Sequence, residues 1–338
     1  MDSTVLNPKF DVYGIGNAIM DLQLKVAEDD LERFELEKGA MRLVDVDQQQ
    51  RLIEYFHGQA LNQASGGSAA NTMIALSQLG GRAAYGCLVG DDAFGKFYFS
   101  EMRDLAVELH TKPVQGKVTG TCVILVTPDA ERTMNTHLGA SADLSASDVS
   151  EELISQSKWL YVEGYLFTSE GGQGAVRRAV SLAKKHNVRV AVTFSDGFIV
   201  DVFGEPLRET VRQADLVFAN LNEAQRYTGI TDENKAFLAL CDEAANVVMT
   251  MSERGARVRY DGQTEFIEAT PVQAEDDTGA GDMFAGGFLY GVTHGLDGRQ
   301  AGSLACFLAG KVVSQMGPRL QCDVRKLVEG QSFLPAMR

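Results

Sequence analysis

The residues with the clearest chemical potential are Gly279-Ala280-Gly281-Asp282, which stand directly before an apolar run of small residues. Because glycine has no Cβ, such a loop can bring several backbone N–H groups close to one point. A helix that begins here adds unpaired N–H donors and a partial positive charge. The loop therefore predicts an anion hole, beside which Asp282 can take a proton from an attacking hydroxyl. A simpler interpretation, a tight turn whose aspartate caps the helix, stays open on these residues alone.

Two segments nearer the N-terminus carry further polar residues beside glycines. A short strand over residues 11–15 enters a glycine turn that Asn17 and Asp21 follow. A second glycine-rich turn, over residues 64–68, leads into an apolar run with the period of a helix. In that second segment Ser68 is the predicted helix cap, and Asn71 lies in the first turn of the helix.

The remaining pattern predicts the elements that must position these residues. Apolar runs alternate with helical segments in the second half of the chain, which indicates an α/β fold with a mostly parallel sheet covered on both faces. The predicted strands are residues 83–89, 160–163, 188–194, 216–219 and 247–251, and the predicted helices are residues 69–79, 175–185, 280–294 and 300–315.

Two half-polar segments stand apart from this alternation. Residues 22–44 and 118–136 contain runs in which apolar and polar side chains alternate, as in strands with one exposed face. Such segments can pair into a small separate sheet. Over a phosphate site that sheet would act as a lid, which excludes water from transfer chemistry.

Composition restricts the partners and the compartment. The chain has 338 residues, a formal net charge of −15 and a pI of about 4.8, which disfavours nucleic acid and anionic membrane surfaces as partners. Five cysteines, without a C-x-x-C pair, fit a reducing compartment, and no run is long and apolar enough to span a membrane. We expect a cytoplasmic protein. No Walker A loop, G-x-G-x-x-G loop or zinc-ligand spacing occurs.

Four motifs, in order along the chain, resemble those of one kinase family. They are Gly66-Gly67 with Asn71, Gly90-Asp91-Asp92 with Gly95, Asn220-Leu221-Asn222-Glu223, and Asp276 to Asp282 with Asp277 in place of the usual threonine. The family is that of the PfkB-type, or ribokinase-like, carbohydrate and nucleoside kinases. The resemblance implies a three-layer α/β/α fold with a mostly parallel central sheet and a small β-sheet lid. It implies a single domain over residues 1–338, with the lid formed by segments near residues 20–45 and 112–137.

Within the family, residues 14–21 and 132–141 are most similar to the adenosine kinase branch. The resemblance implies that Asp282 is the base and that Gly279, Ala280 and Gly281 form the anion hole. The residues that it implies for the acceptor are Asn17, Asp21, Gly66, Gly67 and Asn71, with Arg132 and Leu138 from the lid and Tyr165 as an aromatic partner for a nucleobase; Phe167 is a second candidate for that partner. Asp21 would accept from two sugar hydroxyls.

Plainer interpretations of several acceptor-side residues stay open. Asp21 could be a turn cap. Asn71 could be a polar residue at a helix start. Arg132 could be a solvated charge on a hairpin. Tyr165 could be part of the core.

On the nucleotide side the resemblance implies contacts from several loops. These are Asn220, Thr250, Ser252, Gly255, Asp277, Thr278, Gly279 and Gly281. Glu223 would act on Mg²⁺ through bound water, although Asn220 and Glu223 also have the spacing of a capping box. Ser252 stands where the family usually has glycine, which puts close backbone approach to ATP in doubt. We expect Mg²⁺ with ATP, and the segment with Ser314 and Gly317 adds K⁺ as a candidate.

The expected function is transfer of phosphate from ATP to the primary hydroxyl of a nucleoside, with adenosine the first choice. A sugar kinase of the same family, acting on ribose, fructose or 2-keto-3-deoxygluconate, is one alternative. A nucleoside-binding protein with weak catalysis is another. The lid strands could also pair two subunits into a homodimer.

Overall fold

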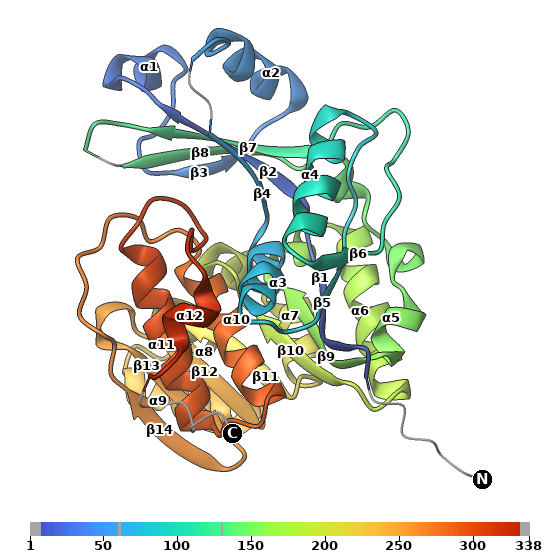
Figure 1. The fold of residues 1–338 in the computed structure, drawn as a ribbon, viewed down its shortest axis with the longest axis vertical. Coiled ribbons are helices and arrows are strands. Elements are labelled where there is room, and N and C mark those ends of the chain that lie inside the picture. Colours follow the sequence, from blue (N-terminus) through green and yellow to red (C-terminus); the bar gives the residue numbers. More distant parts are fainter. Residues whose placement is uncertain (1–7, 60–61, 130, 332–338) are drawn as a thin grey trace.

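A nine-stranded sheet forms the centre of the larger part of the molecule (Figure 1). The computed structural model describes residues 8–59, 62–129 and 131–331, so the predicted domain over residues 1–338 includes short stretches outside the described residues. The strand order is β14 (Gln263–Ile267), β13 (Ala256–Tyr260), β12 (Asn246–Thr250), β11 (Leu216–Asn220), β10 (Arg189–Thr193), β9 (Ser157–Glu163), β1 (Phe10–Ile15), β5 (Ala83–Gly86) and β6 (Val107–Leu109). All neighbours from β12 to β6 are parallel, and only β13 and β14 join antiparallel.

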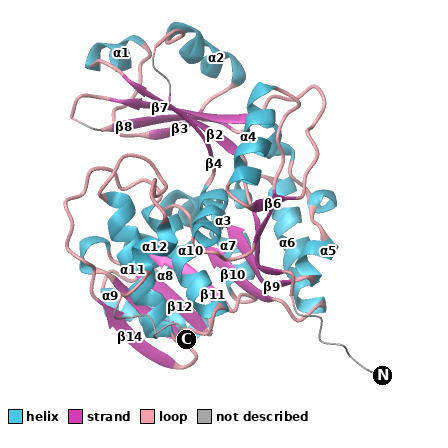
Figure 2. Cartoon of the chain, viewed as in Figure 1, coloured by secondary structure: helices cyan, strands magenta, loops and turns pink. Residues whose placement is uncertain are grey.

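Helices cover both faces of this sheet (Figure 2). One layer contains α3 (Ser68–Gln78), α10 (Ala280–Thr293) and α11 (Gly298–Val313), with α12 (Val324–Val328) packed outside. The other contains α5 (Glu151–Ser155), α6 (Glu170–Lys185), α7 (Gly197–Val211), α8 (Leu221–Thr228) and α9 (Glu233–Glu243). Successive side chains of a strand point to opposite faces, so each strand must be apolar on both. In β9, Trp159 joins the first core and Leu160 the second. The predicted three-layer α/β/α architecture is confirmed.

A second sheet of five strands lies above the larger part (Figure 1). Its order is β3 (Met41–Leu43), β8 (Arg132–His137), β7 (Gly120–Val126), β2 (Ile19–Lys25) and β4 (Asn62–Gly66). The two half-polar segments therefore pair with each other, because β2 runs parallel to β7. The outer face carries α1 (Glu28–Arg33) and α2 (Val46–Tyr55), and α4 (Ala93–Asp104) stands beside the sheet.

The two faces of the second sheet have separate apolar clusters. Alternate residues of β2, such as Leu22 and Leu24, pack with residues of α1 and α2 such as Leu31 and Leu52. The opposite face carries a smaller cluster, which faces the larger part of the molecule. We call it the inner cluster; its members are Ile19, Cys122, Ile124 and Val126, with Met134 and Leu138 packed against them.

One local prediction was wrong at the second glycine-rich segment. Residues 62–66 are not part of a turn but form strand β4, which pairs antiparallel with β2. The segment contains no β-branched or aromatic residue, so its strand conformation depends on the partner strand. The helix cap is Gly67, with a φ of 102°, and Ser68 is the first residue of α3. The strand predicted over residues 83–89 also ends earlier, at Gly86.

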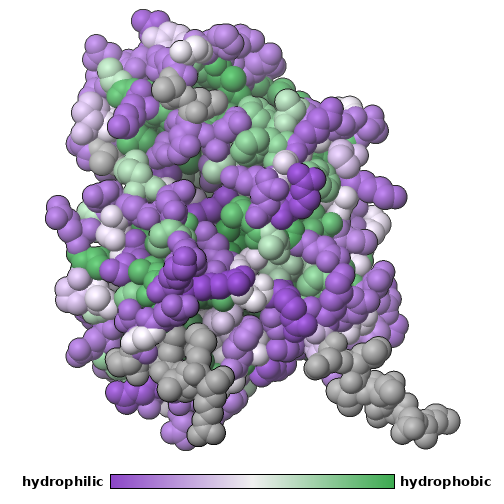
Figure 3. Space-filling model, viewed as in Figure 1, coloured by the Kyte–Doolittle hydropathy of each residue, from purple (hydrophilic) through white to green (hydrophobic). Residues whose placement is uncertain are grey.

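The surface is mostly hydrophilic on the face shown in Figure 3, in keeping with the charged composition. Apolar residues gather on this face where the second sheet meets the larger part. Within the described part of the chain, no helix combines the length and the apolar character needed to cross a bilayer.

Candidate active site

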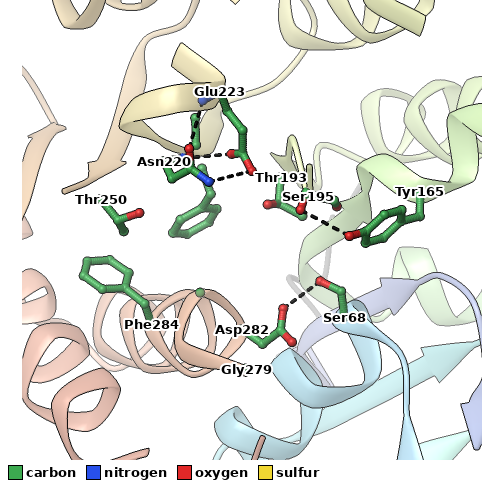
Figure 4. A pocket seen from close by; sticks show the side chains of 13 residues that line it. Ser68, Tyr165, Thr193, Ser195, Asn220, Glu223, Thr250, Gly279, Asp282 and Phe284 are labelled. Carbon is green, nitrogen blue, oxygen red and sulfur yellow. Dashed lines mark hydrogen bonds between the residues drawn. The ribbon is translucent and has the colours of Figure 1, made fainter. Parts of the chain in front are cut away.

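A pocket lies at the carboxyl ends of β10, β11 and β12 and beside the start of α10 (Figure 4). The carboxyl edge of a parallel sheet is where open α/β folds bind ligands. The lining residues are Ser68, Tyr165, Thr193, Ser195, Phe218, Ala219, Asn220, Glu223, Thr250, Gly279, Gly281, Asp282 and Phe284. In Figure 4, Asp282 and Ser68 point towards each other on one side of the pocket, while Asn220 and Glu223 lie on the other.

The loop at Gly279 has a conformation that requires glycine. Gly279 has a φ of 74°, and a Cβ there would lie 2.6 Å from the backbone oxygen of Pro318. It is also the N-cap residue of α10, and among the described residues no side chain caps this helix. Its first N–H groups therefore lie beside the pocket with the positive end of the helix dipole. Ala280 and Gly281 are the first two residues of the helix, so the backbone supports the predicted anion hole.

Asp282 is held by two side chains of α3. Its Oδ1 accepts a hydrogen bond from the Ser68 hydroxyl at 2.6 Å, and its Oδ2 accepts one from Asn71 Nδ2 at 3.2 Å. Burial raises the pKa of Asp282 to about 6, against the lowering effect of these two hydrogen bonds. The carboxylate is therefore mostly ionised at neutral pH and close to its point of titration, which suits a general base. The interpretation of Asp282 as a helix cap is wrong, because its partners lie on another helix.

Ser68 is a residue that the sequence reasoning assigned to another role. We predicted it as a cap, but its side chain bonds to the candidate base. The signal was weak: a hydroxyl residue that directly follows two glycines at a helix start is ordinary capping chemistry.

Asp21 lies within β2, so the interpretation of Asp21 as a turn cap is also wrong. Its carboxylate lies over Gly66, where a Cβ would be 2.3 Å from Asp21 Oδ2. Burial raises the pKa of Asp21 to about 6, although Arg319 and Arg132 favour its ionised form. The nearby charge of Asp282 adds to this rise.

Asn17 and Gly67 meet at the junction between the two sheets. A Cβ on Gly67 would lie 2.1 Å from the backbone oxygen of Asn17, so only glycine allows this approach. The N–H of Asn17 and the N–H of Ala69 both donate to the buried carboxylate of Glu163, at 2.7 and 2.8 Å. We did not predict Glu163, although a charged residue at the end of an apolar strand was a usable signal.

Arg132 connects the second sheet to the loop before α10. Its Nη1 lies 2.6 Å from Asp276 Oδ1, and the two side chains are 11% and 1% exposed. The interpretation of Arg132 as a solvated hairpin charge is therefore wrong. Asp276 also accepts from the N–H groups of Thr278, at 2.9 Å, and Gly317, at 2.8 Å. Burial alone would raise the pKa of Asp276, but these contacts outweigh it and hold the pKa below its usual range.

The two aromatic candidates for a nucleobase partner have different environments. Tyr165 lines the pocket, and its hydroxyl donates to the backbone oxygen of Ser195 at 3.4 Å. Phe167 is buried in the core and does not line the pocket. Leu138 packs against the inner cluster of the second sheet.

Asn220 and Glu223 form the capping box that their spacing predicts. The Asn220 side chain accepts from the Glu223 N–H at 2.8 Å, and the Glu223 carboxylate accepts from Asn220 N at 2.8 Å and from Asn220 Nδ2 at 2.9 Å. Burial raises the pKa of Glu223 to about 7. Both residues also line the pocket, so the capping box does not withdraw their side chains from it.

The other predicted nucleotide residues are spread more widely. Thr250 lines the pocket, and Asp277 is exposed beside Thr278 on the loop before α10. Ser252 and Gly255 lie beyond the lining of this pocket. Ser252 has a φ of 52°, a left-handed conformation that glycine adopts more readily.

A sequence model described as the pfkB family carbohydrate kinase matches residues 41–324. The chain belongs to the pfkB family of carbohydrate kinases. It is therefore a kinase, and the three-layer fold with its smaller second sheet is the ribokinase-like fold of that family.

Individual relatives include both nucleoside and sugar kinases. The crystal structure of adenosine kinase from Sinorhizobium meliloti is 37% identical, with a TM-score of 0.87, and the match covers 95% of this chain and 98% of that one. A probable sugar kinase from Rhizobium etli is 33% identical, with a TM-score of 0.89 over 97% of this chain and 100% of that one. Ribokinase from Haemophilus influenzae is 31% identical over 245 residues, 70% of this chain and 76% of the relative.

Proposed function

We propose that this pfkB-family kinase transfers the γ-phosphoryl group of ATP to the primary hydroxyl of a nucleoside, with adenosine as the first choice. The observation that carries the proposal is the position of Asp282. Its carboxylate stands between the start of α10, which can hold a phosphoryl group, and Asn71 and Asp21 on the acceptor side. The likeness to the adenosine kinase of Sinorhizobium meliloti supports the nucleoside as acceptor.

In the proposed reaction, Asp21 accepts from two hydroxyls of the sugar and thereby orients it, with Asn17, Gly66, Gly67 and Asn71 around the ring. Asp282 takes the proton of the primary hydroxyl as its oxygen bonds to the γ-phosphorus. The bond from that phosphorus to the β–γ bridging oxygen breaks, and ADP leaves with the electron pair. The N–H groups of Gly279, Ala280 and Gly281 stabilise the charge on the transferred group.

The second sheet would serve as a lid over this reaction. Its inner cluster faces the larger part. The ion pair between Arg132 and Asp276 would hold the second sheet against the loop before α10. Leu138 on the lid and Tyr165 below would enclose the base of a nucleoside. Enclosure removes water that would otherwise compete with the acceptor.

The donor set on the nucleotide side fits Mg²⁺ that arrives with ATP. Both oxygens of Glu223 accept hydrogen bonds from Asn220, so this carboxylate would act on the ion through water. No cluster of three metal-ligating side chains occurs among the described residues, which suits an ion held mainly by phosphates and water. When bound, Mg²⁺ neutralises charge on the β- and γ-phosphates. Thr250, Ser252, Gly255, Asp277 and Thr278 would complete the nucleotide side.

A sugar acceptor is the second candidate, and one observation favours it. The inner cluster of the second sheet contains no aromatic residue, so the lid side offers a nucleobase no ring to stack on. The ribokinase and probable sugar kinase among the relatives agree with this alternative.

An ADP-release assay with Mg-ATP tests the proposal. The acceptors are adenosine, inosine, guanosine, ribose, fructose and 2-keto-3-deoxygluconate, each with and without K⁺. Adenosine-dependent turnover above all sugars supports the proposal, and the K⁺ arms test the predicted potassium site. Turnover with a sugar alone moves the assignment to the second candidate. Adenosine binding without ADP release would indicate a protein that only binds nucleosides.

A further inference from the structure

Arg319 is a buried cation that no part of the reaction above uses. It follows Pro318, the residue that packs against Gly279, in the loop between α11 and α12, and it is 7% exposed. Its guanidinium has three partners. Nε donates to Asn71 Oδ1 at 3.2 Å, Nη2 donates to Ser65 Oγ at 3.3 Å, and Nη1 lies 3.5 Å from Glu101 Oε2.

The contact with Asn71 determines which way its carboxamide points. Asn71 Oδ1 faces Arg319, so Nδ2 faces Asp282 and donates to its carboxylate. The reverse orientation would place the amide oxygen against a carboxylate and the amide NH₂ against a guanidinium. Both contacts would then be repulsive, because neither pair would combine a donor with an acceptor. Arg319 therefore selects the orientation of Asn71 that stabilises ionised Asp282.

Arg319 also contributes charge to an enclosed set of carboxylates. It favours the ionised form of Asp21, which the charges of Asp282 and Glu101 oppose. Several ionisable groups interact electrostatically with Asp21 or Asp282 from the surrounding elements: Arg132, Arg319, Glu101, Glu163, Cys122, Tyr85, Tyr98, Tyr161 and Tyr165. Two cations thus face four carboxylates. Removal of either cation raises the pKa of Asp21 directly, whereas Arg319 reaches Asp282 through Asn71.

We propose that Arg319 is a positioning residue, which orients Asn71 towards Asp282 and, anchored on Ser65 beside Gly66, places a positive charge near Asp21. The proposal rests on the proposed function for its catalytic meaning. It predicts two separable effects of losing Arg319. The effect through Asn71 falls on the base, and therefore on kcat; the effect on Asp21 falls on acceptor binding, and therefore on KM.

The first test needs no substrate. Protein labelled with ¹³C at the aspartate carboxyl carbon is titrated by NMR, and the Asp282 resonance is assigned by its loss in Asp282→Asn. In Arg319→Met we expect the pKa of Asp282 to rise by about one unit. Without Arg319 the Asn71 amide can rotate, and its Nδ2 donates less often to the ionised Asp282 carboxylate. The control is Arg299→Met, because the Arg299 side chain is 71% exposed and pairs with Glu265 at the surface.

The second test is the pH dependence of turnover with the best acceptor. Arg319→Met should move the acidic limb of kcat to higher pH and raise the acceptor KM, while thermal unfolding is followed to exclude global damage. The double variant Asn71→Ala/Arg319→Met should have the acidic limb of kcat at the same pH as Asn71→Ala alone. Its acceptor KM should still be higher than that of Asn71→Ala. A purely structural role would add a further loss of kcat in the double variant.

The outcomes separate the inference from the proposed function. A shifted Asp282 titration in a protein without kinase turnover supports the role of Arg319 and rejects the function. Normal turnover with an Asp282 titration that Arg319→Met leaves unchanged rejects the role. If Arg319→Met does not fold, Arg319→Leu replaces it, because leucine also lacks a donor for Asn71 and Ser65. An unchanged titration in Arg319→Leu would then overturn the proposal.

Discussion

Replacing Ser68 with alanine is expected to raise the pKa of the candidate base without disturbing the fold. The Ser68 hydroxyl donates to Asp282 Oδ1 at 2.6 Å, and only the ionised carboxylate gains fully from that bond. A hydrogen bond to a charged group contributes about 1.5–3 kcal/mol, and one pKa unit corresponds to about 1.4 kcal/mol. Since Asp282 is partly open to the pocket, water replaces some of this bond. We therefore expect a rise of about one unit, from about 6 to about 7.

The assay is the pH dependence of kcat with saturating acceptor and Mg-ATP. At pH 6 about half of the wild-type base is ionised, against about a tenth in Ser68→Ala, so kcat should fall about fivefold there and stay unchanged above about pH 8.5. Ser303→Ala is the matched control, because the Ser303 hydroxyl bonds within its own helix, to the Arg299 carbonyl at 2.9 Å. An acidic limb that lies at the same pH in both variants would refute the assignment of Asp282 as a base tuned by Ser68.

Three further variants test the loop, the contact between the sheets and the burial of the base. Gly279→Ala should lose about 1–3 kcal/mol of stability and most activity. The φ of 74° disfavours a side chain, and the added Cβ would lie 2.6 Å from a backbone oxygen. Thermal unfolding measures the stability, and kcat measures the activity. Arg132→Met should raise the acceptor KM about tenfold, because it removes the ion pair with Asp276 that holds the lid over the acceptor. Initial rates at varied acceptor concentration measure this KM. Asp282→Asn should stabilise the protein above pH 6 by up to about 3 kcal/mol and not at all at pH 4. Burial raises the pKa of Asp282 in the folded protein from 3.8 to about 6, so the stability of the wild-type protein falls as the pH rises between these values. Denaturant unfolding at the two pH values measures the difference.

Each of these three predictions has a control variant or a result that would contradict it. Gly174→Ala, in a helix where an added Cβ meets nothing within 4 Å, should not lower the unfolding temperature. Lys38→Met removes ion pairs with Glu28 and Asp129 on the outside of the second sheet, so an equal rise of KM there would count against a specific role of Arg132. If Asp282→Asn changes stability equally at both pH values, the raised pKa of Asp282 is wrong.

The parts of the fold that were predictable are those with strong local patterns. The strands over residues 160–163, 188–194, 216–219 and 247–251 are apolar because helices cover both faces, and that same burial made them recognisable. The capping box of Asn220 and Glu223 depends on residues three apart and could also be predicted. Strand β4 could not, because its conformation depends on pairing with β2 rather than on its own residues.

The contacts that tune the site could not be predicted from local patterns. Ser68 and Asp282 are 214 residues apart, and Arg319 and Asn71 are 248 apart, so no periodicity links them. The motifs identified Asp282, but only the packing of α3 against α10 shows which side chains hold its carboxylate. Glycine spacing likewise located the loop at Gly279 without revealing that Pro318 closes it from behind.

The central claim, that Asp282 is the base for phosphoryl transfer in this pocket, is tested most directly by ADP release from Asp282→Asn with the best acceptor at pH 8. The account predicts a fall in kcat of about 10²–10⁴-fold, since general-base catalysis of this kind contributes that much. Affinity for the acceptor and for Mg-ATP, measured by calorimetry, should change little. Turnover within about threefold of wild type in a folded Asp282→Asn protein would contradict the account and require another group to take the proton.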